Sequence, residues 1–64
     1  MIYDNIVKLC ERNGISIMTL EKACGLGNGT IGGWKDGINP RVDRLKLVAD
    51  YFGITIDQLI SENL

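Results

Sequence analysis

The chain has 64 residues, of which 45% are apolar and 23% charged, and its formal net charge is −1. This length suits one small domain near the lower limit for a self-sufficient core, and the apolar content is too high for a disordered tail. No apolar run approaches the roughly 18 residues of a membrane span, and the N-terminus lacks the basic-then-apolar pattern of a secretion signal. We therefore expect one cytoplasmic domain over residues 1–64, with no membrane partner.

The charges are unevenly distributed along the chain. Residues 22–46 carry a net charge of +3, whereas residues 1–21 carry −1 and residues 47–64 carry −3. A basic middle segment is consistent with an anionic partner such as nucleic acid, and equally with ordinary solvated surface.

The first two predicted helices are separated by Gly14. Residues 4–13 are predicted to be helical because apolar side chains recur there at helical spacing. That stripe consists of Ile2, Ile6, Leu9 and Cys10. Ser16 is a suitable N-cap for a second helix that runs to about Cys24. Its predicted inner face consists of Ile17, Leu20, Ala23 and Cys24.

A glycine-rich segment, residues 25–34, follows the second helix and holds the single tryptophan. Gly25 suits the left-handed position after a helix, and Gly27 is the predicted N-cap of a third helix over about residues 28–36. Ile31 and Trp34 lie three residues apart and are predicted to point inward. Trp34 is therefore predicted to belong to the core rather than to stack on bases.

The last two predicted helices span residues 42–52 and about residues 56–60. The inner face of the first consists of Val42, Leu45, Val48, Ala49 and Phe52. Thr55 and Gln58 have the spacing of a capping box, which opens the second. The apolar side chains that pack back from this last helix are predicted to be Ile56, Leu59 and Ile60. The resulting fold class is all-α, with five short helices.

Two cysteines and one glycine pattern raise the question of a bound group. The chain has no histidine and no thiol beyond Cys10 and Cys24, whereas zinc needs about four ligands at motif spacing. The segment from Gly27 to Gly32 matches the G-x-G-x-x-G spacing of dinucleotide-binding loops, but that fingerprint needs a preceding strand, and here the preceding segment is helical. We expect no metal, no cofactor and two small buried thiols.

Residues 16–34, SIMTLEKACGLGNGTIGGW, closely resemble the helix-turn-helix of the lambda-repressor-like (Cro/C1, XRE) family. Residues 39–40 and 45–60 resemble the fourth helix and the C-terminal signature of that family. The chain is especially similar to small repressors of Gram-positive bacteria and their phages. The resemblance covers nearly the whole chain and implies a compact five-helix DNA-binding domain, with the helix-turn-helix at about residues 16–36.

The resemblance implies a small transcriptional regulator, usually a repressor, that binds double-stranded DNA sequence-specifically. It implies a homodimer on a palindromic operator, formed in solution or only on DNA, with the third helix in the major groove. No small-molecule ligand is expected. An enzyme is not expected either, because the chain has no histidine, no nucleophile–base pair and no metal set.

Positions that match the family's motif, together with Thr30 and the nearby basic residues Lys35 and Arg44, supply the candidate site. The expected base-reading residues are Asn28, Gly29, Thr30 and Gly33. The expected phosphate contacts are Ser16, Ile17, Lys35, Asn39, Arg41 and Arg44. Asn28 is the strongest candidate among the readers, because an amide can bond adenine bidentately.

The third helix departs from the family pattern on its outer face. A projection at 100° per residue places Gly29, Gly32, Gly33 and Asp36 opposite the inward side chains. Each interior glycine costs about 1 kcal/mol relative to alanine, so three cost about 3 of the roughly 5 kcal/mol that stabilise a small domain. This face suits close approach to DNA, docking of a partner protein, or no function. An alternative function is therefore a protein–protein interaction module on the same fold.

Two further expectations concern single side chains. Glu21 stands where the family usually has a small residue, and we expect its carboxylate to accept bonds from backbone N–H groups at the start of the third helix. Tyr51, Ile60 and Leu64 are candidates for a dimer contact.

Overall fold

The computed structural model describes residues 2–61 of the protein, which form five helices and no strand. The helices are α1 (Ile2–Asn13), α2 (Ile17–Ala23), α3 (Thr30–Lys35), α4 (Val42–Phe52) and α5 (Ile56–Leu59). The predicted all-α class and the order of the five helices are therefore confirmed.

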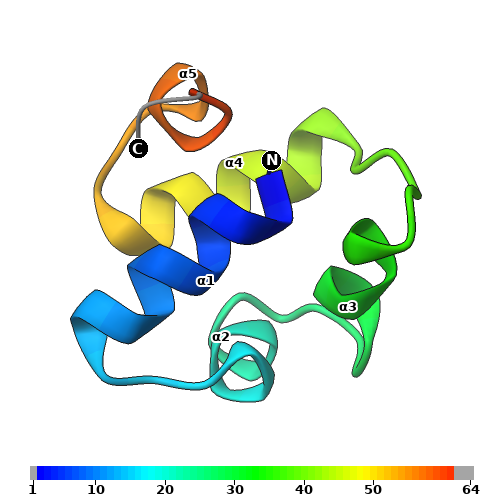
Figure 1. Ribbon diagram of the computed structural model, residues 1–64, viewed down its shortest axis with the longest axis horizontal. Helices are drawn as coiled ribbons and strands as arrows, with labels where there is room; N and C mark the ends of the chain where they lie inside the picture. The colour runs from blue at the N-terminus through cyan, green and yellow to red at the C-terminus, as the bar shows by residue number, and fades with distance from the viewer. Residues whose placement is uncertain (1, 62–64) are drawn as a thin grey trace.

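The N-terminal helix α1 is the centre of the arrangement (Figure 1). It packs against α2 and α3 on one side and against α5 on the other, and α4 packs against α5. As a result α2 and α3 lie together at one end of the molecule, while α5 lies at the opposite end (Figure 1). The helix-turn-helix unit is thus held away from the C-terminal helix.

One apolar core joins all five helices. Its largest fully buried side chains are Ile6, Leu20, Ile31, Val48 and Leu59. Trp34, at 8% exposed, belongs to the same cluster, which confirms its predicted core position. Three predicted inward residues are exposed instead: Ala23, Val42 and Ile60. Each lies in a terminal turn or cap of its helix, where the chain turns away from the core.

A buried asparagine joins the two ends of the chain. Asn5 of α1 is 4% exposed, and its Nδ2 donates to the carbonyl oxygens of Leu59 and Ser61, each at 2.7 Å. These bonds pair carbonyls at the C-terminal end of α5, which the helix itself leaves without partners. Asn5 thereby anchors α5 to α1.

Most helix ends follow the predicted chemistry. Ser16 caps α2 by accepting from the backbone N–H of Thr19, and Thr55 and Gln58 form the predicted capping box of α5. The bounds of α4 are as predicted, whereas α1 begins two residues earlier. The prediction for the third helix was wrong at its start: the N-cap is Gly29, not Gly27, and the helix is six residues long.

Both cysteines are free thiols, Cys10 within the core and Cys24 packed against it. Cys10 is buried and Cys24 is half-buried, with its Sγ 3.7 Å from the carbonyl oxygen of Leu47. Burial raises the pKa of Cys10, and a charge on Cys24 would raise it further. Burial alone raises the pKa of Cys24. The neutral thiols are therefore favoured in the folded protein.

The described residues include neither a membrane-spanning helix nor a metal-binding cluster. No helix within residues 2–61 is long and apolar enough to cross a bilayer. The same residues bring together no group of three or more histidine, cysteine, aspartate or glutamate side chains that could hold a metal ion.

Candidate nucleic-acid interface

The turn between α2 and α3 is built from backbone hydrogen bonds and one left-handed glycine at each end. After the C-cap Cys24, Gly25 has φ +70°, which a side chain would oppose. The N–H of Leu26 then returns to the carbonyl oxygen of Glu21 at 2.8 Å. Gly29, with φ +86°, redirects the chain into α3. This geometry fixes where α3 begins relative to α2.

Glu21 forms the side-chain link across the turn. It is 3% exposed; its Oε2 accepts the N–H of Ile31 at 2.8 Å, and its Oε1 accepts the N–H of Gly29 at 3.2 Å. The expected role of Glu21 at the start of the third helix is therefore confirmed. A carboxylate at a helix N-terminus is also favoured by the helix dipole.

The outer face of α3 has two interior glycines rather than the predicted three. Gly29 is the N-cap, where its positive φ favours glycine, and Asp36 is the C-cap. Only Gly32 and Gly33 lie inside the helix, so the expected cost falls from about 3 to about 2 kcal/mol. A Cβ built on Gly32 meets no atom within 4 Å, so this position is open.

Gly33 is covered by a side chain from the following loop. A Cβ built there would lie 3.2 Å from Cδ1 of Ile38, whose N–H also lies 3.4 Å from the carbonyl oxygen of Gly33. Ile38 itself is 62% exposed. The predicted bare face is therefore partly wrong: on the Gly33 side, α3 presents the apolar side chain of Ile38 instead of backbone.

This difference between the two glycines gives a stability prediction. Gly32→Ala should raise the free energy of unfolding by about 0.5–1 kcal/mol, because it adds helix propensity in open space. Gly33→Ala should gain at most half as much, because the side chain of Ile38 must shift by a few tenths of an ångström. Urea denaturation monitored by the fluorescence of Trp34 measures both changes. A larger gain for Gly33→Ala would contradict the observed contact.

The four predicted base readers lie just before and within α3. Asn28 and Gly29 are exposed in the turn before the helix, whereas the predicted helix over residues 28–36 included both. Thr30 is the first residue of α3 and is half-buried. Gly33 is half-buried beneath Ile38. The first three thus form one continuous segment at the N-terminal end of α3.

The predicted phosphate contacts fall on three segments that border the helix-turn-helix. Ser16 and Ile17 lie at the N-terminus of α2, where Ser16 is exposed and Ile17 half-buried. Lys35 ends α3, and its Nζ lies 5.9 Å from the ring centroid of Tyr3. The remaining three are exposed in the loop after α3 and the first turn of α4: Asn39, Arg41 and Arg44. Arg41 is not a free cation, because its Nε lies 3.4 Å from Oδ1 of Asp43.

Comparison with known protein families shows to which family the chain belongs. The sequence model of the Cro/C1-type helix-turn-helix family matches residues 6–59, from α1 to the end of α5. The chain belongs to the Cro/C1-type helix-turn-helix family. Searches of curated proteins and of solved structures found no significant match.

Membership of this family assigns the lambda-repressor-like fold and the general class of activity. Cro/C1-type proteins are regulators of transcription that bind double-stranded DNA. They are not typically enzymes. In this family the segment from α2 through α3 is the helix-turn-helix, so the candidate residues described above lie in and beside the DNA-binding unit.

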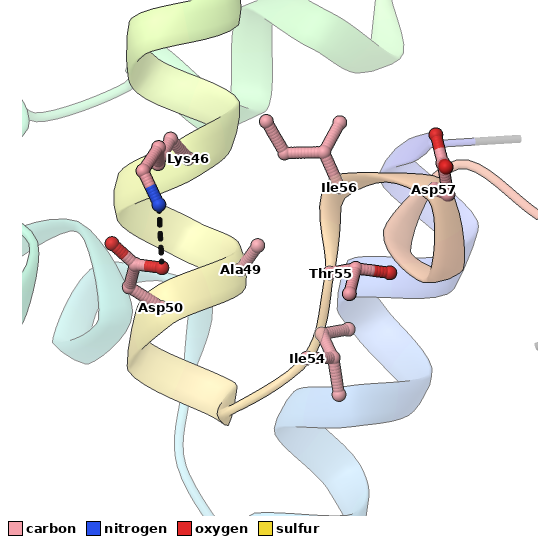
Figure 2. A pocket seen from close by; sticks show the side chains of 7 residues that line it. All are labelled: Lys46, Ala49, Asp50, Ile54, Thr55, Ile56 and Asp57. Atoms are coloured by element: carbon pink, nitrogen blue, oxygen red, sulfur yellow. Dashed lines mark hydrogen bonds and ion pairs between the residues drawn. The ribbon is translucent and has the colours of Figure 1, made fainter.

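A groove of about 370 Å³ lies between α4 and the segment that leads into α5 (Figure 2). Its apolar lining comes from Ala49, Ile54 and Ile56. At its α4 side Nζ of Lys46 bonds Oδ1 of Asp50 at 3.2 Å (Figure 2). None of its lining residues comes from α2 or α3, so this groove is separate from the candidate DNA-binding residues.

Two contacts at the candidate interface were not predicted from the sequence. The contact of Ile38 with Gly33 is local: Gly37, with φ +89°, ends α3, and the N–H of Ile38 returns to the carbonyl oxygen of Gly33. A glycine followed by an apolar residue at a helix end is the signal that could have indicated it. The proximity of Lys35 to Tyr3 joins residues 32 positions apart, and it arises because α3 packs against α1.

Proposed function

We propose that the protein is a small transcriptional repressor that binds a palindromic operator as a homodimer, with α3 in the major groove. The observation that carries this proposal is the exposed segment Asn28–Gly29 at the N-terminal end of a helix held firmly against α2. Asn28 reads adenine, Thr30 and the backbone at Gly29 approach neighbouring base edges, and the family fold supplies the orientation.

Charge distribution supports contact with phosphates. The segment 22–46, which contains α3 and the loop after it, carries a net charge of +3 within a chain of net charge −1. The N-terminus of α2, with Ser16 and Ile17, lies at the phosphate backbone. Further sequence-independent affinity comes from Lys35, Asn39, Arg41 and Arg44. DNA shape adds selectivity where Gly32 offers no side chain.

The homodimer forms through the end of the molecule opposite α3. Tyr51 is 45% exposed and Ile60 41% exposed, which leaves apolar surface on α4 and beside α5. Leu64, the third candidate for this contact, lies outside the described residues. A contact at that end leaves α3 of each copy free to enter successive major grooves.

The salt dependence of binding to random-sequence duplex tests the proposal. A protein that neutralises about four phosphates loses roughly a hundredfold in affinity between ~50 and ~200 mM salt. We expect a loss of that order, and selection from a random duplex pool should then yield a palindromic operator. Absence of binding at ~50 mM salt would refute the proposed function.

Two substitutions separate phosphate contacts from base reading. Arg41→Ala should weaken binding to all sequences alike and reduce the salt slope by about 1, whereas Asp43→Asn, which frees Arg41, should strengthen it. Asn28→Ala should flatten the preference among operator variants and leave random duplex unaffected. Equal effects of Asn28→Ala on every sequence would remove it as a reader.

A second candidate function is docking of a partner protein on the outer face of α3. It is favoured by the exposed apolar side chains Ile38 (62%) and Val42 (70%), which lie just after α3. Failure to bind any duplex at low salt would favour this candidate over DNA binding.

A further inference from the structure

Helix α3 has few means of its own to stay folded or to hold its direction. It has six residues, two of them glycine, and helices this short are unstable in isolation. Its N-cap, Gly29, has no side chain and makes no side-chain capping bond. The first N–H groups of the helix therefore need partners from elsewhere in the fold.

Glu21 supplies partners on both sides of the helix start. Its two carboxylate oxygens accept the N–H groups of Gly29 and Ile31, while its own carbonyl oxygen accepts the N–H of Leu26 in the turn. Charge-assisted bonds of this kind are roughly twice as strong as neutral ones. One residue of α2 thus holds the turn and the first turn of α3 together.

The two anchored amides lie next to the predicted base readers. Asn28 directly precedes Gly29, and Thr30 lies between the two anchored residues. Glu21 is 3% exposed and lies under the turn, so its carboxylate is not available to bind DNA itself. Any effect of this carboxylate on base reading must therefore pass through the backbone that it holds.

We infer that Glu21 is a positioning residue for DNA recognition, whose carboxylate fixes the entry of α3 so that Asn28 and Thr30 meet the base edges. This inference rests on the proposed function. A positioning role differs from a general role in stability, because positioning affects discrimination between sequences, whereas five of the six predicted phosphate contacts lie outside α3 and only Lys35 belongs to it.

Three variants test the inference. Glu21→Gln keeps one carbonyl oxygen as an acceptor, and Glu21→Ala keeps none. Thr55→Ala is the matched control, because it removes a cap of α5 at the end of the molecule opposite α3 (Figure 1). Affinities for the selected operator and for random duplex are measured at low temperature, where the fluorescence of Trp34 verifies that each variant is folded.

We expect Glu21→Gln to reduce operator affinity about tenfold, in line with the loss of one bond to a charged group. Glu21→Ala should reduce it further, while affinity for random duplex changes less than about twofold in either variant. Thr55→Ala should leave the ratio of the two affinities unchanged. Equal losses on operator and random duplex, or the same change of ratio in Thr55→Ala, would overturn the inference.

Amide hydrogen exchange gives a second readout that needs no DNA. In Glu21→Gln the amides of Ile31 and Trp34 should exchange faster than in the wild type, relative to the amides of α1 and α4. Uniform acceleration throughout the domain would contradict a positioning role, even if Glu21→Ala failed to fold. If the wild type bound no duplex, the proposed function would fail, and exchange would still decide whether Glu21 fixes α3.

Discussion

Replacing Asn5 with alanine is expected to reduce the free energy of unfolding by about 2–4 kcal/mol. The substitution removes two 2.7 Å bonds and leaves the carbonyl oxygens of Leu59 and Ser61 without their donor. A buried carbonyl that loses its partner, as that of Leu59 would, costs about 1–3 kcal/mol, and the part-buried carbonyl of Ser61 adds a smaller amount. Since a domain of this size has about 5 kcal/mol in total, a large share of its stability depends on this one side chain.

Asn13→Ala is the matched control for this prediction. Nδ2 of Asn13 also donates to a carbonyl at 2.7 Å, but the acceptor is Leu9, one turn earlier on α1, and Asn13 is exposed. Water can replace that bond, so the expected loss is below about 1 kcal/mol. Urea denaturation followed by Trp34 fluorescence compares the two. Similar losses of unfolding free energy in the two variants would show that the bonds from Asn5 to the end of α5 stabilise the domain no more than a local bond on α1 does.

The two asparagines also illustrate which features of the fold the sequence could predict and which it could not. Periodicity located α4 to the residue, and the spacing of Thr55 and Gln58 predicted the cap of α5, because both depend on neighbours in the chain. Asn5 lies beside the apolar stripe of α1, and its acceptors are more than 50 residues away. No local pattern records a contact over that separation.

In the candidate site, too, some features could be predicted from the sequence and others could not. The hydrogen bonds of Glu21 were predictable, because a carboxylate at an inward position of a helix-turn-helix needs donors, and the start of the next helix offers them. The residue at which α3 starts could not be predicted. Gly27 and Gly29 both suit an N-cap, and only the backbone angle φ of +86° at Gly29 decides between them. The contact of Ile38 with Gly33 was open to prediction, because Gly37 ends α3 in the left-handed conformation and an apolar residue after such a glycine commonly packs back on the last turn.

These features together make α3 dependent on its surroundings. Its glycines lower its intrinsic stability, Glu21 holds its start, and Ile31 and Trp34 hold its inner face. On its outer face Gly32 is open, whereas Gly33 is in contact with the side chain of Ile38. The core side of α3 is therefore where a substitution should have its largest effect on the whole domain.

Ile31→Ala tests that dependence and is expected to cost about 2–5 kcal/mol of unfolding free energy. Ile31 is fully buried, and its truncation removes apolar contacts and leaves a cavity that the surroundings fill only partly. Against a total of about 5 kcal/mol, a loss at the upper end of this range would leave about half of the molecules unfolded at 25 °C. Hydrogen exchange at lower temperature should show α3 opening first, because Trp34 alone then holds its inner face.

Val42→Ala is the matched control, because it also truncates a β-branched side chain in a helix. Val42 is 70% exposed, so its replacement should change the free energy of unfolding by less than about 0.5 kcal/mol. Urea denaturation of the two variants, with Ile31→Val as an intermediate expected to lose about 0.5–1.5 kcal/mol, measures the series. A loss for Ile31→Ala no greater than that for Val42→Ala would mean that α3 is held by Glu21 and Trp34 without the contact of Ile31 with the core.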